Sequence, residues 1–118
     1  MLARSSASVA RDKLTRRMPS VPVVLPQHRY AVHIEPNALD RLGGVIREVA
    51  PASSAALFAD PAVRGTLLPR ARASLESAGY EVIEHALPGG EASKTLDGVR
   101  ALYEVLLSRR LERRSPIV

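Results

Sequence analysis

The residues best suited to chemistry lie in two short polar stretches. Asp60 ends the apolar run SSAALFAD, and the segment LPGGEASKT, residues 87–95, joins a second strand-like run to an amphipathic one. The glycines permit positive φ angles and close approach to the backbone, and a helix that follows them offers free N–H groups. Lys94 adds a cation, while Asp60 or Glu91 could accept hydrogen bonds from ribose hydroxyls. A phosphate or pyrophosphate would suit this corner of the protein.

The general motifs leave two interpretations of this segment open. GGEASKT contains a Lys-Thr pair but lacks the spacing of a P-loop, and no G-x-G-x-x-G occurs in the sequence. A glycine turn that leads into a helix cap explains the same residues without any ligand. His28, His33 and His85 show no i, i+4 spacing, so we expect structural roles for them rather than a metal site. The sequence has no cysteine and no G-x-S-x-G, so it predicts no nucleophile-base pair.

The elements that must position these residues alternate between strands and helices, which predicts an α/β fold with a parallel sheet and right-handed crossovers. Proline and glycine set several boundaries. Pro69 is tolerated only near a helix start, so its segment is expected in two pieces, and Gly79 is expected to end it. The predicted elements are a hairpin over 21–34, a helix over 36–51, a strand over 53–60, a helical segment over 61–79, a strand over 80–88, a helix over 93–111 and a strand that opens with PIV at 116–118.

Two of these helices carry more detailed expectations. Asn37 is the predicted N-cap of the first, and Ser93 or Thr95 is the predicted cap of the last. In the last helix, one stripe of apolar residues has the spacing of an amphipathic helix. Its members are Leu96, Val99, Tyr103, Leu106 and Leu107.

Charge and composition limit the partners of the chain. The net charge is +5, but residues 1–17 contribute +4 of it, since they contain five basic residues and only Asp12 as an acid. The remainder is nearly neutral, and the basic cluster at 109–114 is expected to be a solvated helix end, so we predict no nucleic-acid partner. No run of about 18 apolar residues occurs, which predicts no membrane span. The absence of cysteine suits a reducing cytoplasm.

The first residues, 1–20, form a separate basic extension in this interpretation. Their Ser, Ala and Arg content superficially matches an organelle transit peptide. We expect instead a disordered segment, or a reading frame extended upstream of a true start at Met18.

Three segments of the sequence resemble the amino-terminal part of 3-dehydroquinate synthase. They are YAVHIEPNALDRLG at 30–43, LFADPAV at 57–63, and the whole of 80–118. In that family the loop Gly-Glu-x-x-Lys-Ser/Thr helps to bind NAD, and the acid that ends the preceding strand also contacts it. The resemblance therefore implies a cofactor-binding set in this chain. Its members are Asp60, Gly89, Gly90, Glu91, Ala92, Ser93 and Lys94.

Two departures from the family pattern concern single positions. Many members have Asp where this chain has Gly89, and many have Asn where it has Ala62. Each change removes a polar side chain, although backbone groups remain available to a cofactor.

The resemblance also implies a fold and an activity. Residues 21–118 would be the amino-terminal portion of a Rossmann-like parallel-sheet domain with a β-hairpin at its start, and the domain that binds metal and substrate would be absent. The whole enzyme would be a cytoplasmic lyase, homodimeric, that uses NAD and zinc or cobalt. It would convert a sugar phosphate, 3-deoxy-D-arabino-heptulosonate 7-phosphate, to 3-dehydroquinate and phosphate in the shikimate pathway.

The same resemblance limits what this chain does alone. The glycine-rich pyrophosphate loop, the metal ligands and the substrate-binding residues of the family would follow Val118, so this chain would contain no catalytic residue and be inactive by itself. Other interpretations stay open. They are another sugar-phosphate cyclase, of the 2-epi-5-epi-valiolone or 2-deoxy-scyllo-inosose type, an iron-type alcohol or glycerol dehydrogenase, and a non-enzymatic half-domain.

Overall fold

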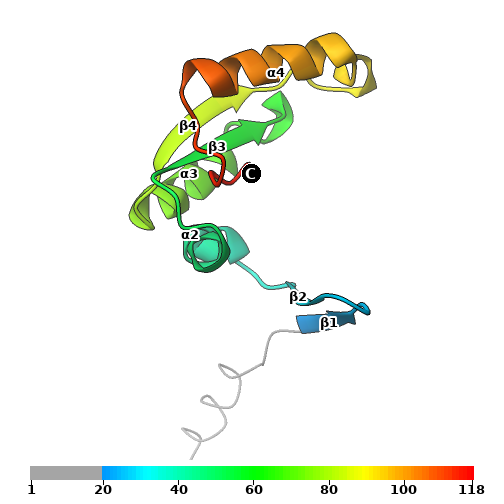
Figure 1. Cartoon of the computed structure of the whole chain (residues 1–118), viewed down its shortest axis with the longest axis vertical. Helices are drawn as coiled ribbons and strands as arrows, with labels where there is room; N and C mark the ends of the chain where they lie inside the picture. Colours follow the sequence, from blue (N-terminus) through cyan, green and yellow to red (C-terminus); the bar gives the residue numbers. More distant parts are fainter. Residues whose placement is uncertain (1–19) are drawn as a thin grey trace, which may run out of the picture. The chain divides into compact units, whose positions relative to one another are not determined.

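A computed structural model describes residues 20–118 of the chain. The expected basic extension lies outside these residues, apart from Ser20. The chain divides into two compact units, one that ends at Ala38 and one that comprises Leu39–Val118. Figure 1 labels the helices and strands of both units.

The first unit contains the predicted hairpin. Strands β1, Ser20–Val24, and β2, Arg29–His33, pair antiparallel, and the Leu25 amide donates a hydrogen bond of 2.8 Å to the His28 carbonyl across the turn. Pro22 lies opposite Ala31. Both strands are edges of a two-stranded sheet, and a proline, which cannot donate to a ladder, is tolerated at an edge.

The second unit is built on a parallel sheet. Strands β3, Ser54–Ala59, and β4, Glu81–Ala86, pair in parallel, and their ends coincide because Ala59 lies opposite Ala86. The last residues of the chain add to the other edge of β3: the Ala56 amide donates to the Pro116 carbonyl at 3.0 Å, and the Phe58 amide donates to the Val118 carbonyl at 2.9 Å. Residues 116–118 therefore pair with β3 in parallel, as the prediction for PIV requires, although the pairing is an isolated bridge and not a named strand.

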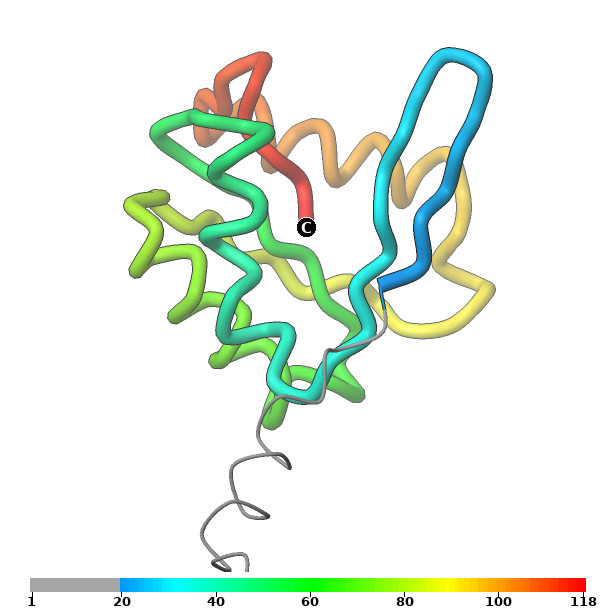
Figure 2. Tube along the Cα trace, turned by 90° about the horizontal axis from the view of Figure 1, so that it is seen from below, coloured from blue at the N-terminus to red at the C-terminus, as the bar shows by residue number. Residues whose placement is uncertain are grey.

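Helices lie on both sides of this sheet, with α4 along one side and α3 along the other (Figures 1 and 2). The alternation of parallel strands and helices confirms the α/β class and the order expected for the amino-terminal portion of a Rossmann-like domain. The helices are α2, Ala38–Val49; the 3₁₀ turn η1, Pro61–Val63; α3, Leu68–Ser77; the 3₁₀ turn η2, Glu91–Ser93; and α4, Leu96–Ser108.

The proline and glycine boundaries are confirmed. Pro69 lies in the first turn of α3, where its missing amide proton would have no helical partner. At the other end Gly79 has φ +87°, its amide donates to the Glu76 carbonyl at 2.9 Å, and the Tyr80 amide donates to the Leu75 carbonyl at 3.1 Å. These two bonds form a Schellman motif, which satisfies the last carbonyls of the helix.

The core lies between the sheet and the helices α2 and α3. Its centre is the fully buried Leu75, and Tyr80 is buried beside it. The Tyr80 hydroxyl donates a hydrogen bond of 2.6 Å to the Ala50 carbonyl, and the Arg47 guanidinium lies 4.8 Å from the centre of the Tyr80 ring. The other buried members are Ala52, Ala55, Leu57, Leu68 and Ala71.

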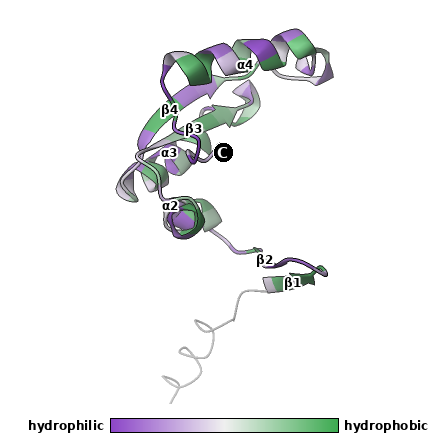
Figure 3. Ribbon diagram, in the orientation of Figure 1, coloured by the Kyte–Doolittle hydropathy of each residue, from purple (hydrophilic) through white to green (hydrophobic). Residues whose placement is uncertain are grey.

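Helix α4 differs from the expectation for an amphipathic helix. Apolar residues recur along it as the periodicity predicts (Figure 3). Leu96, Tyr103 and Leu107 are nevertheless exposed by 88%, 61% and 76%, and only Leu106 of the predicted stripe is half-buried. Within residues 20–118, no other element covers most of this stripe. The spacing correctly predicted that these residues share an apolar face, but it did not predict that most of this face would be exposed.

The predicted cap of α2 also differs in conformation. Asn37 directly precedes the helix, as expected, but its φ is +63°, in the left-handed region. The usual N-cap conformation is extended. Asn tolerates the left-handed region better than most residues, because its short polar side chain can bond to nearby backbone.

Candidate functional site

The two polar stretches meet where β3 and β4 end. Asp60 directly follows β3, and residues 87–95 follow β4. The Leu87 amide donates a hydrogen bond of 3.0 Å to the Ala59 carbonyl, which ties the start of the loop to the end of β3. Ligands of open α/β sheets bind outside the carboxyl ends of the strands, so this edge of the sheet is the place where a ligand site is expected.

Asp60 is held by the turn that it begins. It is the N-cap of η1, and its Oδ1 accepts a hydrogen bond of 2.8 Å from the Ala62 amide. Its other oxygen, Oδ2, has no hydrogen-bond partner among the described residues and faces the backbone of Gly89. The cap therefore orients the carboxylate and leaves one oxygen to accept from a ligand. The bond uses a backbone amide, so the alanine at position 62 does not weaken it.

The loop after β4 is ordered by its own hydrogen bonds. Gly90 has φ +86°, and its carbonyl accepts from both the amide and the hydroxyl of Ser93, at 3.3 and 2.8 Å. Ala92 is exposed within η2. Thr95 rather than Ser93 is the N-cap of α4, because its Oγ1 accepts from the Gly98 amide at 3.1 Å. The sequence left these two caps open, and the structure selects Thr95.

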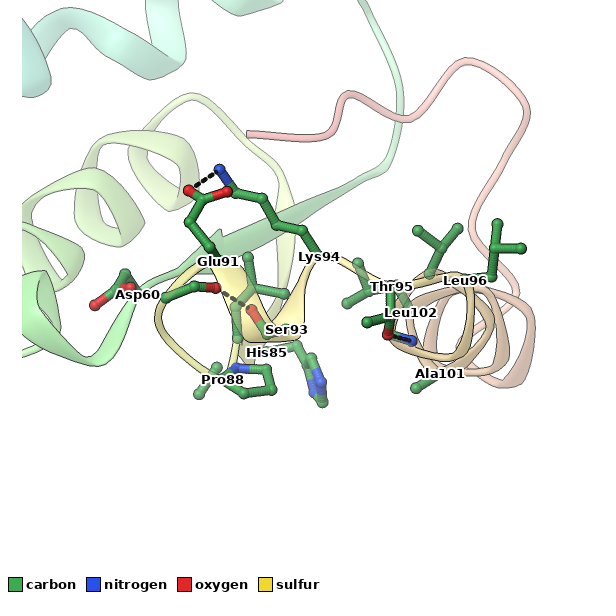
Figure 4. Close-up of a pocket in the computed structure, with 15 residues that line it drawn as sticks. Asp60, His85, Pro88, Glu91, Ser93, Lys94, Thr95, Leu96, Ala101 and Leu102 are labelled. Carbon is green, nitrogen blue, oxygen red and sulfur yellow. Dashed lines mark hydrogen bonds and ion pairs between the residues drawn. The ribbon is translucent and has the colours of Figure 1, made fainter.

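Glu91 and Lys94 form an ion pair. Lys94 Nζ lies 2.6 Å from Glu91 Oε1, and both side chains point toward one another on one side of the loop (Figure 4). Both are mostly exposed, 71% for Lys94 and 87% for Glu91. An exposed pair of this kind contributes about 0–1 kcal/mol. An anionic ligand can therefore compete with Glu91 for Lys94.

A groove of about 1140 Å³ lies beside this loop. Its polar side contains Asp60, Glu91 and Lys94, and its apolar side is formed by β4, the loop and α4. A volume of this size suits a ligand as large as a nucleotide. The apolar side includes Leu87, Pro88, Val99 and Leu102.

Sequence reasoning missed His85 and this apolar side. His85 lines the groove and also packs against Phe58, with the ring centres 6.1 Å apart and an edge-to-face angle of 87°. Figure 4 shows His85 on the opposite side of the loop from the Glu91–Lys94 pair. Its position next to the last residue of β4 was the available indication that it would lie near the site.

Other features of the described residues lie outside the groove. Within 20–118, no three or more His, Cys, Asp or Glu residues gather where they could hold a metal ion. None of the helices in these residues has the length and hydrophobicity that spanning a bilayer requires. On α3, Arg72 donates hydrogen bonds to Glu76 and Glu84. These bonds raise the pKa of Arg72 above its ordinary value, and the bond to Glu76 has the larger effect. The contact with Glu76 lies within α3, whereas the contact with Glu84 joins α3 to β4.

The amino-acid sequence of this chain is similar to those of several known proteins over part of their length. No protein-family model matches it. It is 37% identical over 98 residues to the 3-dehydroquinate synthases of Microcystis aeruginosa and Nostoc punctiforme, and 36% identical over 98 residues to that of Gloeobacter violaceus. Each alignment covers 83% of this chain and 27% of the relative, so the chain spans about a quarter of the length of these relatives. We conclude that this chain is homologous to 3-dehydroquinate synthases over part of their length.

Proposed function

We propose that this chain provides part of the NAD-binding site of a 3-dehydroquinate synthase. The observation that carries the proposal is the meeting of Asp60 with the loop 89–94 at the carboxyl ends of β3 and β4, in a chain homologous to these enzymes. This is the position at which dinucleotides bind to open parallel sheets.

The residues at this edge suit the chemical parts of NAD. Asp60 Oδ2 is available to accept a hydrogen bond from a ribose hydroxyl, and Lys94 is a mobile cation that suits a phosphate. Gly90 is exposed, lines the groove and has nothing within 4 Å of its Cβ position, so it leaves the backbone open to a ligand. The apolar side, with Val99 and Leu102, offers a surface for a ring. Pockets of this composition, mostly apolar with a few placed polar groups, are typical of cofactor sites.

The roles that we assign to these residues are binding and orientation. In the whole enzyme, bound NAD supplies transient oxidation and re-reduction of a ring hydroxyl, the chemistry that converts 3-deoxy-D-arabino-heptulosonate 7-phosphate to 3-dehydroquinate and phosphate. Asp60, Glu91 and Lys94 hold the cofactor and break no bond of the substrate. The residues that would bind zinc or cobalt and the sugar phosphate are assigned to the rest of such an enzyme. We therefore expect this chain to be inactive alone.

Binding of NAD to the purified chain tests the proposal. Thermal unfolding is followed by far-UV circular dichroism at increasing NAD concentrations, up to millimolar. A ligand that binds only the folded state stabilises it by RT ln(1 + [L]/Kd), about 2.7 kcal/mol at a hundredfold excess over Kd. We expect a saturable rise in the unfolding temperature.

Two variants complete the test. Lys94→Ala removes the groove cation and is expected to reduce the rise, whereas Arg100→Ala removes an exposed cation of α4 that does not line the groove and is expected to preserve it. A folded chain whose unfolding temperature does not respond to millimolar NAD would contradict the proposal.

A further inference from the structure

We infer that Gly89 is a positioning residue for the carboxylate of Asp60, an inference that rests on the proposed NAD site. The absence of a side chain at position 89 lets the carboxylate lie directly against the loop backbone. The role of Gly89 is thus to leave space for another residue rather than to bind the cofactor itself.

The contact between the two residues is close. A Cβ atom added at Gly89 would lie 2.8 Å from Asp60 Oδ2 and 3.4 Å from both Cγ and Oδ1, and these are its three nearest atoms. Carbon and oxygen atoms that are not bonded do not approach to 2.8 Å without a shift of one of them. Asp60 is therefore the group that a side chain at position 89 would displace.

The backbone does not require glycine at this position. Among the glycines of the described residues only Gly79 and Gly90 have positive φ angles, so the conformation at Gly89 is open to any L-residue. Gly90 shows the reverse: its φ is +86°, and nothing lies within 4 Å of an added Cβ. The two adjacent glycines thus have different functions, since Gly90 turns the chain and Gly89 makes room for the carboxylate.

The carboxylate, and not the loop, is the part that would move. The loop is tied to β3 by the bond from the Leu87 amide to the Ala59 carbonyl, whereas the carboxylate is the end of an exposed side chain. On its far side the carboxylate accepts from the Ala62 amide at 2.8 Å. An alanine at position 89 would turn the carboxylate away, lengthen or break this bond, and move Oδ2 from the mouth of the groove. The fold would remain.

A double-mutant cycle on NAD affinity tests this inference. Isothermal titration calorimetry compares the chain with Gly89→Ala, Asp60→Ala and the double variant. Moving a charged hydrogen-bond acceptor away from a ligand costs about tenfold in affinity. We expect Gly89→Ala and Asp60→Ala each to weaken binding about tenfold, and the double variant to bind no more weakly than Asp60→Ala. Two separate losses that multiply in the double variant would overturn the inference.

A control and a second readout separate this inference from the proposed function. Gly65→Ala places a methyl group where nothing lies within 4 Å and should bind NAD like the unsubstituted chain. The amide resonance of Ala62, measured by nuclear magnetic resonance without ligand, should change alike in Gly89→Ala and Asp60→Ala, and not in Gly65→Ala. An unchanged Ala62 amide in Gly89→Ala would refute the positioning role. Absence of NAD binding by the unsubstituted chain would refute the proposed function and leave the Ala62 resonance to decide the positioning role.

Discussion

Two adjacent glycines in α2 should respond to the same substitution in opposite directions. An added Cβ at Gly43 would lie 2.1 Å from the Ser74 carbonyl oxygen and 2.8 Å from the Ala78 Cβ, so α2 and α3 touch at this point. The Gly43 amide also donates a hydrogen bond of 3.0 Å to the Ser74 hydroxyl. At Gly44 nothing lies within 4 Å. Gly43→Ala should destabilise the fold, and Gly44→Ala should stabilise it.

The expected sizes follow from these contacts. Replacing an unconstrained helical glycine by alanine gains about 0.5–1 kcal/mol, which is the whole effect at Gly44. Gly43→Ala has the same stabilising backbone contribution. It also has two destabilising ones: about 1–3 kcal/mol from overpacking and about 0.5–1.5 kcal/mol if the buried hydrogen bond is lost. The backbone gain cancels between the two variants. We therefore expect Gly43→Ala to be less stable than Gly44→Ala by about 1.5–4.5 kcal/mol, the sum of the other two effects.

Urea denaturation followed by far-UV circular dichroism measures this difference, and the chain has no tryptophan for a fluorescence probe. The m-values should agree between variants, so that midpoints report stability. Equal midpoints, or a lower midpoint for Gly44→Ala, would refute the close approach of α2 to α3.

Three further predictions test separate parts of the structure. Leu75→Ala removes the fully buried centre of the core and should lower the free energy of unfolding by about 2–5 kcal/mol in urea denaturation, and a loss below about 1 kcal/mol would contradict its burial. Tyr80→Phe leaves the Ala50 carbonyl without its donor and should cost about 1–3 kcal/mol, while Tyr30→Phe, on an exposed residue, should cost nothing measurable. Lys94→Ala should change stability by less than about 1 kcal/mol, since its ion pair is exposed, yet weaken NAD binding measured by calorimetry; equal affinity would exclude Lys94 from the site.

Local rules predicted most elements of the second unit because each boundary had a local cause. Pro69 can stand only in the first turn of a helix, and Gly79 supplies the positive φ that ends one. The central residues of SSAALFAD are apolar on both faces. This pattern suits a strand that pairs at both edges and has helices on both sides of its sheet. In these places the chemistry of single residues decides the conformation.

Periodicity could not predict what covers a face. The apolar stripe of α4 has the spacing of a packed helix, but Leu96 and Leu107 remain exposed. The sequence of a helix determines which residues share a face, whereas burial depends on whether another part of a protein lies against that face. The spacing of residues within one helix cannot show whether another part of a protein covers it.

At the candidate site, too, the sequence predicted the positions of residues along the chain but not their contacts in space. The sequence indicated that Asp60 and Lys94 follow neighbouring strands, and parallel pairing brings their segments to one edge. It could not show that Lys94 pairs with Glu91, that Gly89 is packed against the Asp60 carboxylate, or that His85 lines the groove. These contacts depend on the three-dimensional path of a loop around a positive φ at Gly90.

The central claim is that Asp60 and the loop 89–94 contact NAD, and a titration of the ¹⁵N-labelled chain with NAD tests it residue by residue. We predict saturable shifts of the amide resonances of Ala62 and of residues 89–94, with smaller shifts at the start of α4 and none on the far side of the sheet, in α3. Shifts confined to α3 or to the hairpin, or no shift at millimolar NAD in a folded chain, would contradict the account.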